Sequence, residues 1–244
     1  MKLTINLRSF QKEFVAPILE INKDGKAAIF VKDNLLYSIS QTSDNRVSLY
    51  NTYSPFNIED PLPRFNVNLT RLTKALTCLK KAESVSTFNI QNNNLSYQDD
   101  LLKFNLKLLD QNLLIDPKIN PEAIDRFPFT TEIKVEASIM SELKRVLDFS
   151  SETEKFYIEL EGNKLYFLFG DKSAESANVH DDIKILISDN FRGEIPSNIF
   201  NINILKLLER ANTDVIFKLG RNALIAQFQR ENSNYQYLTT SLKK

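Results

Sequence analysis

The sequence of 244 residues has little of several residue types on which common protein functions depend. It contains one cysteine, one histidine and five glycines. A single cysteine excludes an internal disulfide and a cysteine-cluster zinc site. The glycines form neither a GxxxxGK[ST] nor a GxGxxG motif, so no phosphate-binding glycine loop is recognisable. No apolar run approaches the roughly 18 to 20 residues that a membrane-spanning helix needs, and we expect no membrane partner.

The charges of the chain balance, with 31 basic and 31 acidic residues and a formal net charge of zero. A neutral protein does not hold nucleic acid with its whole surface, so any such contact has to come from a local patch. The N-terminal stretch MKLTINLRSF lacks the apolar core of a signal peptide. We therefore expect an intracellular protein, in the nucleus or the cytoplasm depending on the host.

Side chains that could carry catalysis are few and isolated. His180 is followed by Asp181 and Asp182, a trio that could hold a metal ion, although an exposed trio of this kind usually does not. Cys78 stands beside basic residues that could activate its thiol, but no histidine partner accompanies it. We expect no enzyme, no cofactor and no metal site, and an enzyme that depends on His180 ranks last among the alternatives.

Four stretches of the chain have the pattern of a β-hairpin, in which two apolar or aromatic runs flank a polar turn. Asparagine tolerates the positive φ that tight hairpin turns require, and it marks the expected turn of each stretch: Asn34, Asn94, Asn163 and Asn222. The first and third turns are 129 residues apart, and the second and fourth are 128 apart. This near-equal spacing predicts two domains that each contain the same unit twice.

A short helical pattern precedes each hairpin. Apolar residues at helical spacing define four buried stripes: Leu7, Phe10 and Phe14; Leu69, Leu72, Leu76 and Leu79; Ile139, Leu143, Val146 and Leu147; and Ile204, Leu205, Leu208 and Ala211. Pro17 is expected to end the first helix, because proline cannot donate a helical hydrogen bond, and Asn68 is expected to cap the second. The repeated unit is a strand, a helix and a run of strands, which predicts an α+β fold.

Residues 110–128 contain three prolines and no sustained periodicity. This composition is typical of an extended connector. It divides the chain into an N-terminal domain at 1–109 and a C-terminal domain at 129–244.

The side of each predicted helix that faces away from its apolar stripe carries basic residues. In the run VNLTRLTKALTCLKK, residues 67–81, there are four basic residues and no acid. The polar faces of the four helices present Arg8, Lys12, Arg71, Lys74, Lys81, Lys144, Arg145, Lys206 and Arg210. Any amphipathic helix has a solvated face, and Glu142, Asp148 and Glu209 dilute the pattern in the second half. A row of such faces could also contact DNA phosphates without reading the bases.

Several runs resemble the sliding clamps of eukaryotic-type DNA polymerases, the proliferating cell nuclear antigen family. VNLTRLTKALTC, residues 67–78, is similar to the second inner helix of these clamps. FNLKLLD at 104–110, FTTEIKVEASIMSELKRVLDF at 129–149 and NYQYLTTSLKK at 234–244 resemble the strand that closes the first domain, the start of the second domain and the C-terminal strand. The resemblance spans nearly the whole chain but gives no match at 41–62 and 170–180, and a cellular, viral or phage clamp would fit.

The resemblance implies a ring of six similar domains, each built from two β-α-β-β-β units, with helices lining the hole and sheets outside. Two domains per chain imply a homotrimer around double-stranded DNA. The implied function is a processivity factor that tethers the replicative DNA polymerase and is loaded by a clamp loader ATPase. The nine basic residues above would then face the duplex. The alternative is a structural ring or assembly subunit, without DNA, whose basic faces are merely solvated.

Two further sites are implied in the same way. The ring would close by pairing 104–109 of one chain with 183–188 of the next, through alternating apolar residues: Phe104, Leu106 and Leu108, and Ile183, Ile185 and Ile187. Partner peptides would dock in an outer hydrophobic groove formed by Val47, Leu113, Leu114, Ile115, Tyr237 and Leu238. The competing interpretations are two ordinary strands inside one subunit, and connector leucines that only fasten the connector to its own domain.

Overall fold

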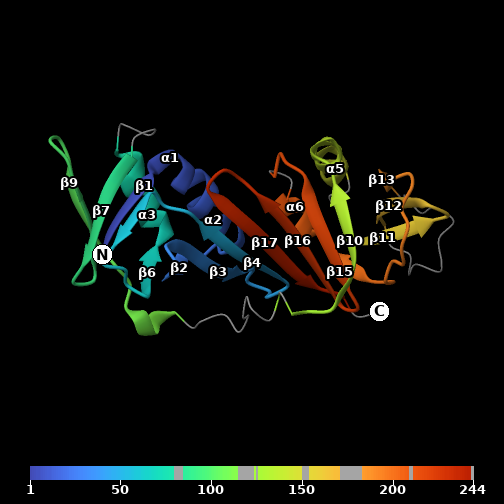
Figure 1. Cartoon of the computed structure of the whole chain (residues 1–244), viewed down its shortest axis with the longest axis horizontal. Coiled ribbons are helices and arrows are strands. Elements are labelled where there is room, and N and C mark those ends of the chain that lie inside the picture. The colour runs from blue at the N-terminus through green and yellow to red at the C-terminus, as the bar shows by residue number, and fades with distance from the viewer. Residues whose placement is uncertain are drawn as a thin grey trace. The chain divides into compact units, whose positions relative to one another are not determined.

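The computed structural model describes residues 1–79, 85–114, 124, 126–149, 154–170, 183–208 and 211–242 (Figure 1). The chain divides into two compact units. Unit 1 comprises Met1–Pro121 and Gln229–Tyr235, and unit 2 comprises Glu122–Phe228 and Gln236–Lys244. The fold is α+β, with mostly antiparallel sheets and few helices, as the sequence predicts.

Unit 1 contains the predicted strand, helix and strands twice. The first copy is β1 (Lys2–Asn6), a helical run of α1 (Leu7–Ser9), η1 (Phe10–Val15) and α2 (Ala16–Ile21), then β2 (Lys26–Lys32), β3 (Leu35–Gln41), β4 (Val47–Tyr53) and the short β5 (Asn57–Glu59). The second copy is β6 (Arg64–Asn68), α3 (Leu69–Thr77), β7 (Val85–Gln91), β8 (Asn94–Gln98) and β9 (Lys103–Lys107), followed by the turn η2 (Gln111–Leu113). The strands are ordered β5-β1-β7-β8-β9 in one sheet and β4-β3-β2-β6 in another.

Unit 2 repeats the pattern. Its first copy is β10 (Phe129–Val135), α5 (Ala137–Phe149), β11 (Lys155–Glu161), β12 (Lys164–Phe169) and β13 (Ile183–Ser188). Its second copy is β14 (Ile199–Asn201), α6 (Asn203–Leu208), β15 (Val215–Gly220), β16 (Ala223–Gln229) and β17 (Ser233–Thr240), although residues 229 and 233–235 of the last two strands belong to unit 1. One sheet has the order β13-β12-β11-β14, and β10, β15, β16 and β17 follow one another in a second sheet.

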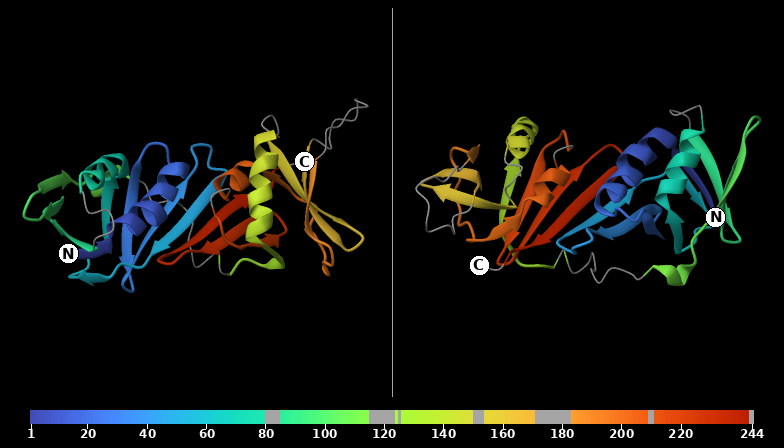
Figure 2. Two further views of the ribbon diagram at one scale, coloured as in Figure 1. Left: turned by 90° about the horizontal axis from the view of Figure 1, so that it is seen from above. Right: turned by 180° about the vertical axis from the view of Figure 1, so that it is seen from behind.

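The helices of each unit pack against each other, α3 against η1 in unit 1 and α5 against α6 in unit 2 (Figures 1 and 2). In unit 1 the predicted leucine stripe is confirmed, because Leu69, Leu72, Leu76 and Leu79 are all buried. They join one core with Phe10, Phe14 and the inner faces of the sheets. Burying one such side chain contributes about 1.5–3 kcal/mol, so this stripe fixes which side of α3 remains in solvent.

The stripes of unit 2 are confirmed in part. Leu143 and Leu147 of α5 are buried, but Met140 takes the third buried position, while Ile139 and Val146 are only half-buried. The predicted stripe of α6 is complete, with Ile204, Leu205, Leu208 and Ala211 all buried. In both helices the exposed side is therefore the one that the sequence predicts.

The hairpin turns agree with the prediction at Asn34 and depart from it elsewhere. Asn34 has a φ of 63° between β2 and β3. In the second hairpin Asn92 and Asn93 form the turn, with φ of 50° and 60°, while Asn94 pairs with Gln91 as the first residue of β8. The prediction of Asn94 is therefore wrong by one residue, because three successive asparagines leave the register of the turn open. In the other two hairpins the asparagine lies in the connection without a positive φ.

Pro17 does not end the first helix, which continues to Ile21. Proline lacks the N–H that would bond the carbonyl of Glu13 in an α-helix. The chain widens to a π-helix over Phe10–Val15, where Ala16 donates its N–H to the carbonyl of Gln11, and Pro17 then takes an early position of α2. The helix tolerates this proline because side chains from elsewhere satisfy the displaced carbonyl.

Most of the predicted connector at 110–128 lies outside the described residues, so that assignment stays a prediction. The part that is described begins after β9 with η2, and β10 starts at Phe129. Within the described ranges, no helix is long and apolar enough to cross a membrane.

Candidate nucleic-acid interface

Helix α3 presents its basic residues on a side without acids. The side chain of Asn68 caps the helix as predicted, since its Oδ1 accepts the N–H of Arg71 at 2.9 Å. Arg71 and Lys74 are exposed, opposite the leucine stripe, and α3 contains no acidic residue. A positive charge in the first turn is unfavourable for the helix dipole, so Arg71 is not placed there to stabilise the helix.

The first helix adds two exposed basic side chains, Arg8 and Lys12. The side chain of Asn6 caps it by accepting the N–H of Ser9 at 3.0 Å. Glu13, which follows Lys12 directly, is only 9% exposed and points inward. The side of unit 1 that carries these helices therefore combines four exposed basic residues with few acids, of which Glu20 in α2 is half-buried.

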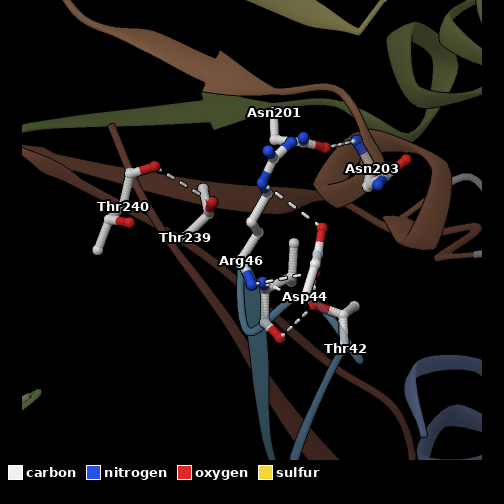
Figure 3. A network of polar contacts seen from close by, with 8 residues as sticks. Thr42, Asp44, Arg46, Asn201, Asn203, Thr239 and Thr240 are labelled. Carbon is white, nitrogen blue, oxygen red and sulfur yellow. Dashed lines mark hydrogen bonds and ion pairs between the residues drawn. The ribbon is translucent and has the colours of Figure 1, made fainter. Parts of the chain in front are cut away.

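Unit 2 places its basic residues among acids. Lys144 and Arg145 of α5 are exposed, but so are Glu142 and Asp148. Arg145 Nη1 lies 3.0 Å from Glu142 Oε2, one turn earlier in the helix. Lys206 of α6 is exposed, and the side chain of Asn201 accepts the N–H of Asn203, the first residue of that helix, at 2.9 Å (Figure 3).

The N-terminus of α5 is capped from a distant part of unit 2. Asp214 Oδ1 accepts the N–H of Ala137 at 3.0 Å, and its Oδ2 lies 2.7 Å from Lys134 Nζ. The hydrogen bond from Lys134, with smaller help from that N–H, lowers the pKa of Asp214. This arrangement fixes where α5 begins and hence which of its residues face solvent.

Three residues predicted for these sites lie outside the described ranges, namely Lys81 and Arg210 of the DNA-facing set and Ile115 of the partner groove. The trio of His180, Asp181 and Asp182 lies outside them as well. Among the side chains that the structure does describe, no group of three or more His, Cys, Asp or Glu is arranged to hold a metal ion.

The two segments predicted to join neighbouring chains are edge strands of their sheets within the described part of the chain. β9 is the last strand of its sheet in unit 1, and β13 is the last of its sheet in unit 2. Phe104, Leu106, Ile183 and Ile185 are half-buried. Leu108 and Ile187, the third apolar residue of each segment, are buried. The apolar residues therefore pack onto their own units, and what the two strands expose is a backbone edge.

The opposite faces of these edge strands are mostly polar or charged, with the apolar Leu186 of β13 43% exposed. On β9 the exposed residues are Lys103, Asn105 and Lys107, and on β13 they are Lys184 and Leu186. Lys184 Nζ contacts Glu161 and lies 3.4 Å from Glu159 Oε2. These contacts, with the hydrogen bond to Glu161 the largest cause, raise the pKa of Lys184.

Two residues of the predicted partner groove have buried side chains. Val47 is fully buried and Tyr237 is 2% exposed, so neither side chain is open to a peptide. Leu238 in unit 2 is half-buried. In unit 1, Leu113 is 65% exposed, while Leu114 is half-buried and lines a cavity of about 230 Å³ together with Ala28 and Ile39.

The connector is fastened at the same place, because Arg64 Nη2 donates to the carbonyl of Leu114 at 3.0 Å. The cavity also borders the turn that joins β3 to β4. There Asp44 accepts hydrogen bonds from the hydroxyl of Thr42 at 2.5 Å and from the N–H of Arg46 at 3.1 Å (Figure 3). The first of these is the main cause of the lowered pKa of Asp44. This turn gives the cavity an ordered rim.

Sequence reasoning missed a buried polar network beneath the first helix. Its members are Glu13, Asn51, Asn232 and Tyr235, all of which belong to unit 1. The position of Pro17 inside a helical stripe was the available signal, because it requires the carbonyl four residues earlier to find another donor.

Comparisons with known proteins give the fold. No protein-family model and no curated protein sequence matches this chain. Among solved structures, the chain is similar to the PCNA of A. fulgidus bound to the C-terminal region of FEN-1, with a TM-score of 0.75 and 13% identity over 100% of this chain and 98% of that one. It is also similar to the proliferating cellular nuclear antigen of Entamoeba histolytica, with a TM-score of 0.73 and 12% identity over 99% and 98% of the two chains.

These likenesses span the whole chain, so the chain has the two-domain clamp fold of the PCNA structures. The predicted fold class is confirmed, and so is the resemblance at the level of the fold.

Proposed function

We propose that this protein is a DNA sliding clamp, a ring-shaped processivity factor that encircles duplex DNA and tethers a replicative DNA polymerase. The observation that carries the proposal is the basic, exposed face of the unit 1 helices, with Arg8, Lys12, Arg71 and Lys74. The clamp fold supports it. Contacts of lysine and arginine with phosphates carry no sequence information, which suits a protein that must slide along any duplex.

The ring in this proposal is a homotrimer, closed by pairing of β9 in one chain with β13 in the next. Both strands are sheet edges in the described part of the chain, and unpaired edges invite such pairing. The proposal assigns the protein no catalysis of its own and an intracellular location. Its partners would be duplex DNA, a DNA polymerase and a clamp loader ATPase.

Partner peptides would dock at the connector in unit 1. The cavity beside Leu114 offers an apolar wall of Ala28 and Ile39 with a polar rim that includes Lys26 and Gln41. Leu114→Ser should weaken binding of a C-terminal peptide from the cognate polymerase. Leu113→Ser is the matched control, because Leu113 is exposed and does not line the cavity. Equal losses in both variants would contradict this docking site.

The experiment that tests the function is processive synthesis on primed circular DNA by the cognate polymerase, with and without this protein and the loader. We expect long products only when protein, loader and ATP are all present. Product lengths that do not change when the protein is added would refute the clamp and favour an assembly subunit whose basic faces are merely solvated.

A further inference from the structure

Glu13 is a buried acid in the middle of the helix that carries Lys12. It is 9% exposed, and its Oε2 accepts the backbone N–H of Asn232 at 3.1 Å. The carbonyl of Asn232 in turn accepts the N–H of Ser54 at 2.8 Å. A carboxylate that is removed from water needs such partners, since an unpaired buried charge is strongly unfavourable.

The backbone of the same residue is held from a second direction. The carbonyl of Glu13, which Pro17 cannot bond, accepts the hydroxyl of Tyr235 at 2.5 Å and the side-chain amide of Asn51 at 3.4 Å. That amide also donates to the carbonyl of Phe14 at 3.1 Å. Side chains that insert into the helical hydrogen-bond ladder in this way stabilise a π-turn, and π-turns occur frequently at functional sites.

The π-turn decides which way two opposite charges point. In a regular α-helix Glu13 would stand about 100° from its neighbour Lys12 and at the border of the polar face. In the structure Glu13, Phe14 and Val15 are all buried in succession, whereas Lys12 is exposed. The turn thus removes the one acid of η1 from the surface on which Lys12 and Arg8 are exposed.

We propose that Glu13 is a positioning residue for the DNA-facing surface, and this inference rests on the proposed clamp function. Its anchored carboxylate and carbonyl hold the π-turn that directs Lys12 outward, and they keep its own negative charge away from the phosphates. Without the anchor, the π-turn loses the contacts that hold it, Lys12 leaves its position, and the carboxylate or its replacement moves toward the polar face.

A double-mutant cycle tests this inference on the assembled protein with a short fluorescent duplex at low salt. Lys12→Ala should weaken binding at least about threefold in the wild-type background and lower the slope of log K against log salt, because a phosphate contact is lost in each chain. In the Glu13→Ala background the same change should have almost no effect, since Lys12 is already displaced. Glu13→Gln retains an acceptor for the N–H of Asn232, and Lys12 should keep its full effect there.

Lys74→Ala on α3 is the matched control and should weaken duplex binding by the same factor in every background. If Lys12→Ala and Glu13→Ala simply add, or if Glu13→Gln behaves like Glu13→Ala, the positioning role is refuted. If Glu13→Ala does not fold, Tyr235→Phe removes the bond to the carbonyl of Glu13 and should give the same loss of coupling to Lys12. If no lysine variant, Lys74→Ala included, changes duplex binding, the proposed function itself fails rather than this inference alone.

Discussion

The helices of unit 1 and unit 2 belong to the same repeated unit, but they differ in whether acidic side chains lie beside their exposed basic residues. In unit 1, α3 has no acid at all, and the acid beside Lys12 is buried and hydrogen-bonded. In unit 2, Arg145 is paired with Glu142 on the surface of α5, and Asp148 is exposed on the same helix. A duplicated fold thus keeps its apolar stripes while the charge on its exposed side changes.

The fold requires the apolar stripes, whereas contact with DNA would depend on the charge of the exposed side. The apolar stripes recur in the described helices because each helix has to be buried on one side. Acids on the other side cost the fold little, since an exposed pair such as Glu142 and Arg145 contributes at most about 1 kcal/mol. In the proposed clamp, unit 1 would therefore be the main phosphate-contacting unit, and unit 2 would contribute weakly.

The largest expected effect concerns the edge strands, one from each unit. The N–H of Leu108 bonds the carbonyl of Asn93 in the β8–β9 ladder, so by alternation the N–H of Asn105 points to the free edge of β9. Asn105→Pro removes that donor, and Ile185→Pro disrupts the edge of β13. Each variant alone should sediment as a monomer.

Mixing the two variants provides the control. One intact β9 and one intact β13 remain in the mixture, so the variants should form a heterodimer and no larger species. Trimers of either single variant would contradict this interface, and so would the absence of any association in the mixture.

Charge reversal compares the units directly. Lys12→Glu with Lys74→Glu in unit 1 should weaken duplex binding at low salt by roughly tenfold or more, because each reversal turns a phosphate attraction into a repulsion. Lys144→Glu with Lys206→Glu in unit 2 changes the net charge by the same amount and should weaken duplex binding only about threefold. All four positions are exposed, so thermal unfolding should not change. Equal losses of affinity in the two double variants would contradict a larger contribution of unit 1 to DNA binding.

Removing an acid from unit 2 should make it resemble unit 1. Glu142→Gln releases Arg145 from its ion pair and deletes a negative charge from the exposed side of α5. Duplex affinity should rise by about twofold to threefold at low salt and by less at high salt, where charges are screened. Glu132→Gln on β10 is the control, since it removes an equally exposed acid from a strand instead. A gain of the same size in that control would show a general charge effect.

The smallest expected effect is the pH dependence of the network in unit 1. Burial raises the pKa of Tyr235 to about 12, against about 10 in an unfolded chain. A neutral tyrosine is required in the folded state, so its contribution is complete below pH 10 and is lost between pH 10 and 12. Up to about 2 kcal/mol of the free energy of unfolding should disappear over that window.

Chemical denaturation of wild type and Tyr235→Phe measures this loss. The variant lacks the titrating hydroxyl and should show a smaller decline between pH 10 and 12, so the difference between the two proteins isolates Tyr235 from the lysines that titrate in the same range. Parallel declines would mean that Tyr235 titrates as it does in the unfolded chain.

Much of the fold could be predicted because its determinants are local. The leucine stripe of α3 and its cap at Asn68 follow from periodicity and side-chain chemistry within a few residues, whereas the two edge strands were expected from the family resemblance. The position of the turn at Asn92 and Asn93 could not be predicted from the sequence, because neighbouring asparagines tolerate a positive φ equally well. Glu13 was missed for another reason, since its partners Asn232 and Tyr235 are more than 200 residues away along the chain.

The partner groove shows a different limit. Family resemblance suggests Val47 and Tyr237 for the groove but does not tell whether their side chains are buried or exposed. Strand alternation does give it for β17, where Ser233, Tyr235, Tyr237 and Thr239 share one buried face. The residue that does line a cavity, Leu114, was identified because an apolar run in a polar connector is conspicuous.

The central claim is that the assembled chain surrounds DNA rather than adhering to its surface, and the topology of the DNA tests it most directly. The protein is loaded onto a nicked circular duplex, washed at raised salt, and the plasmid is then cut once with a restriction enzyme. A ring held by topology should remain on the circle and leave when free ends are created. Retention on the linear duplex, or equal loss from both forms at the same salt, would contradict the account.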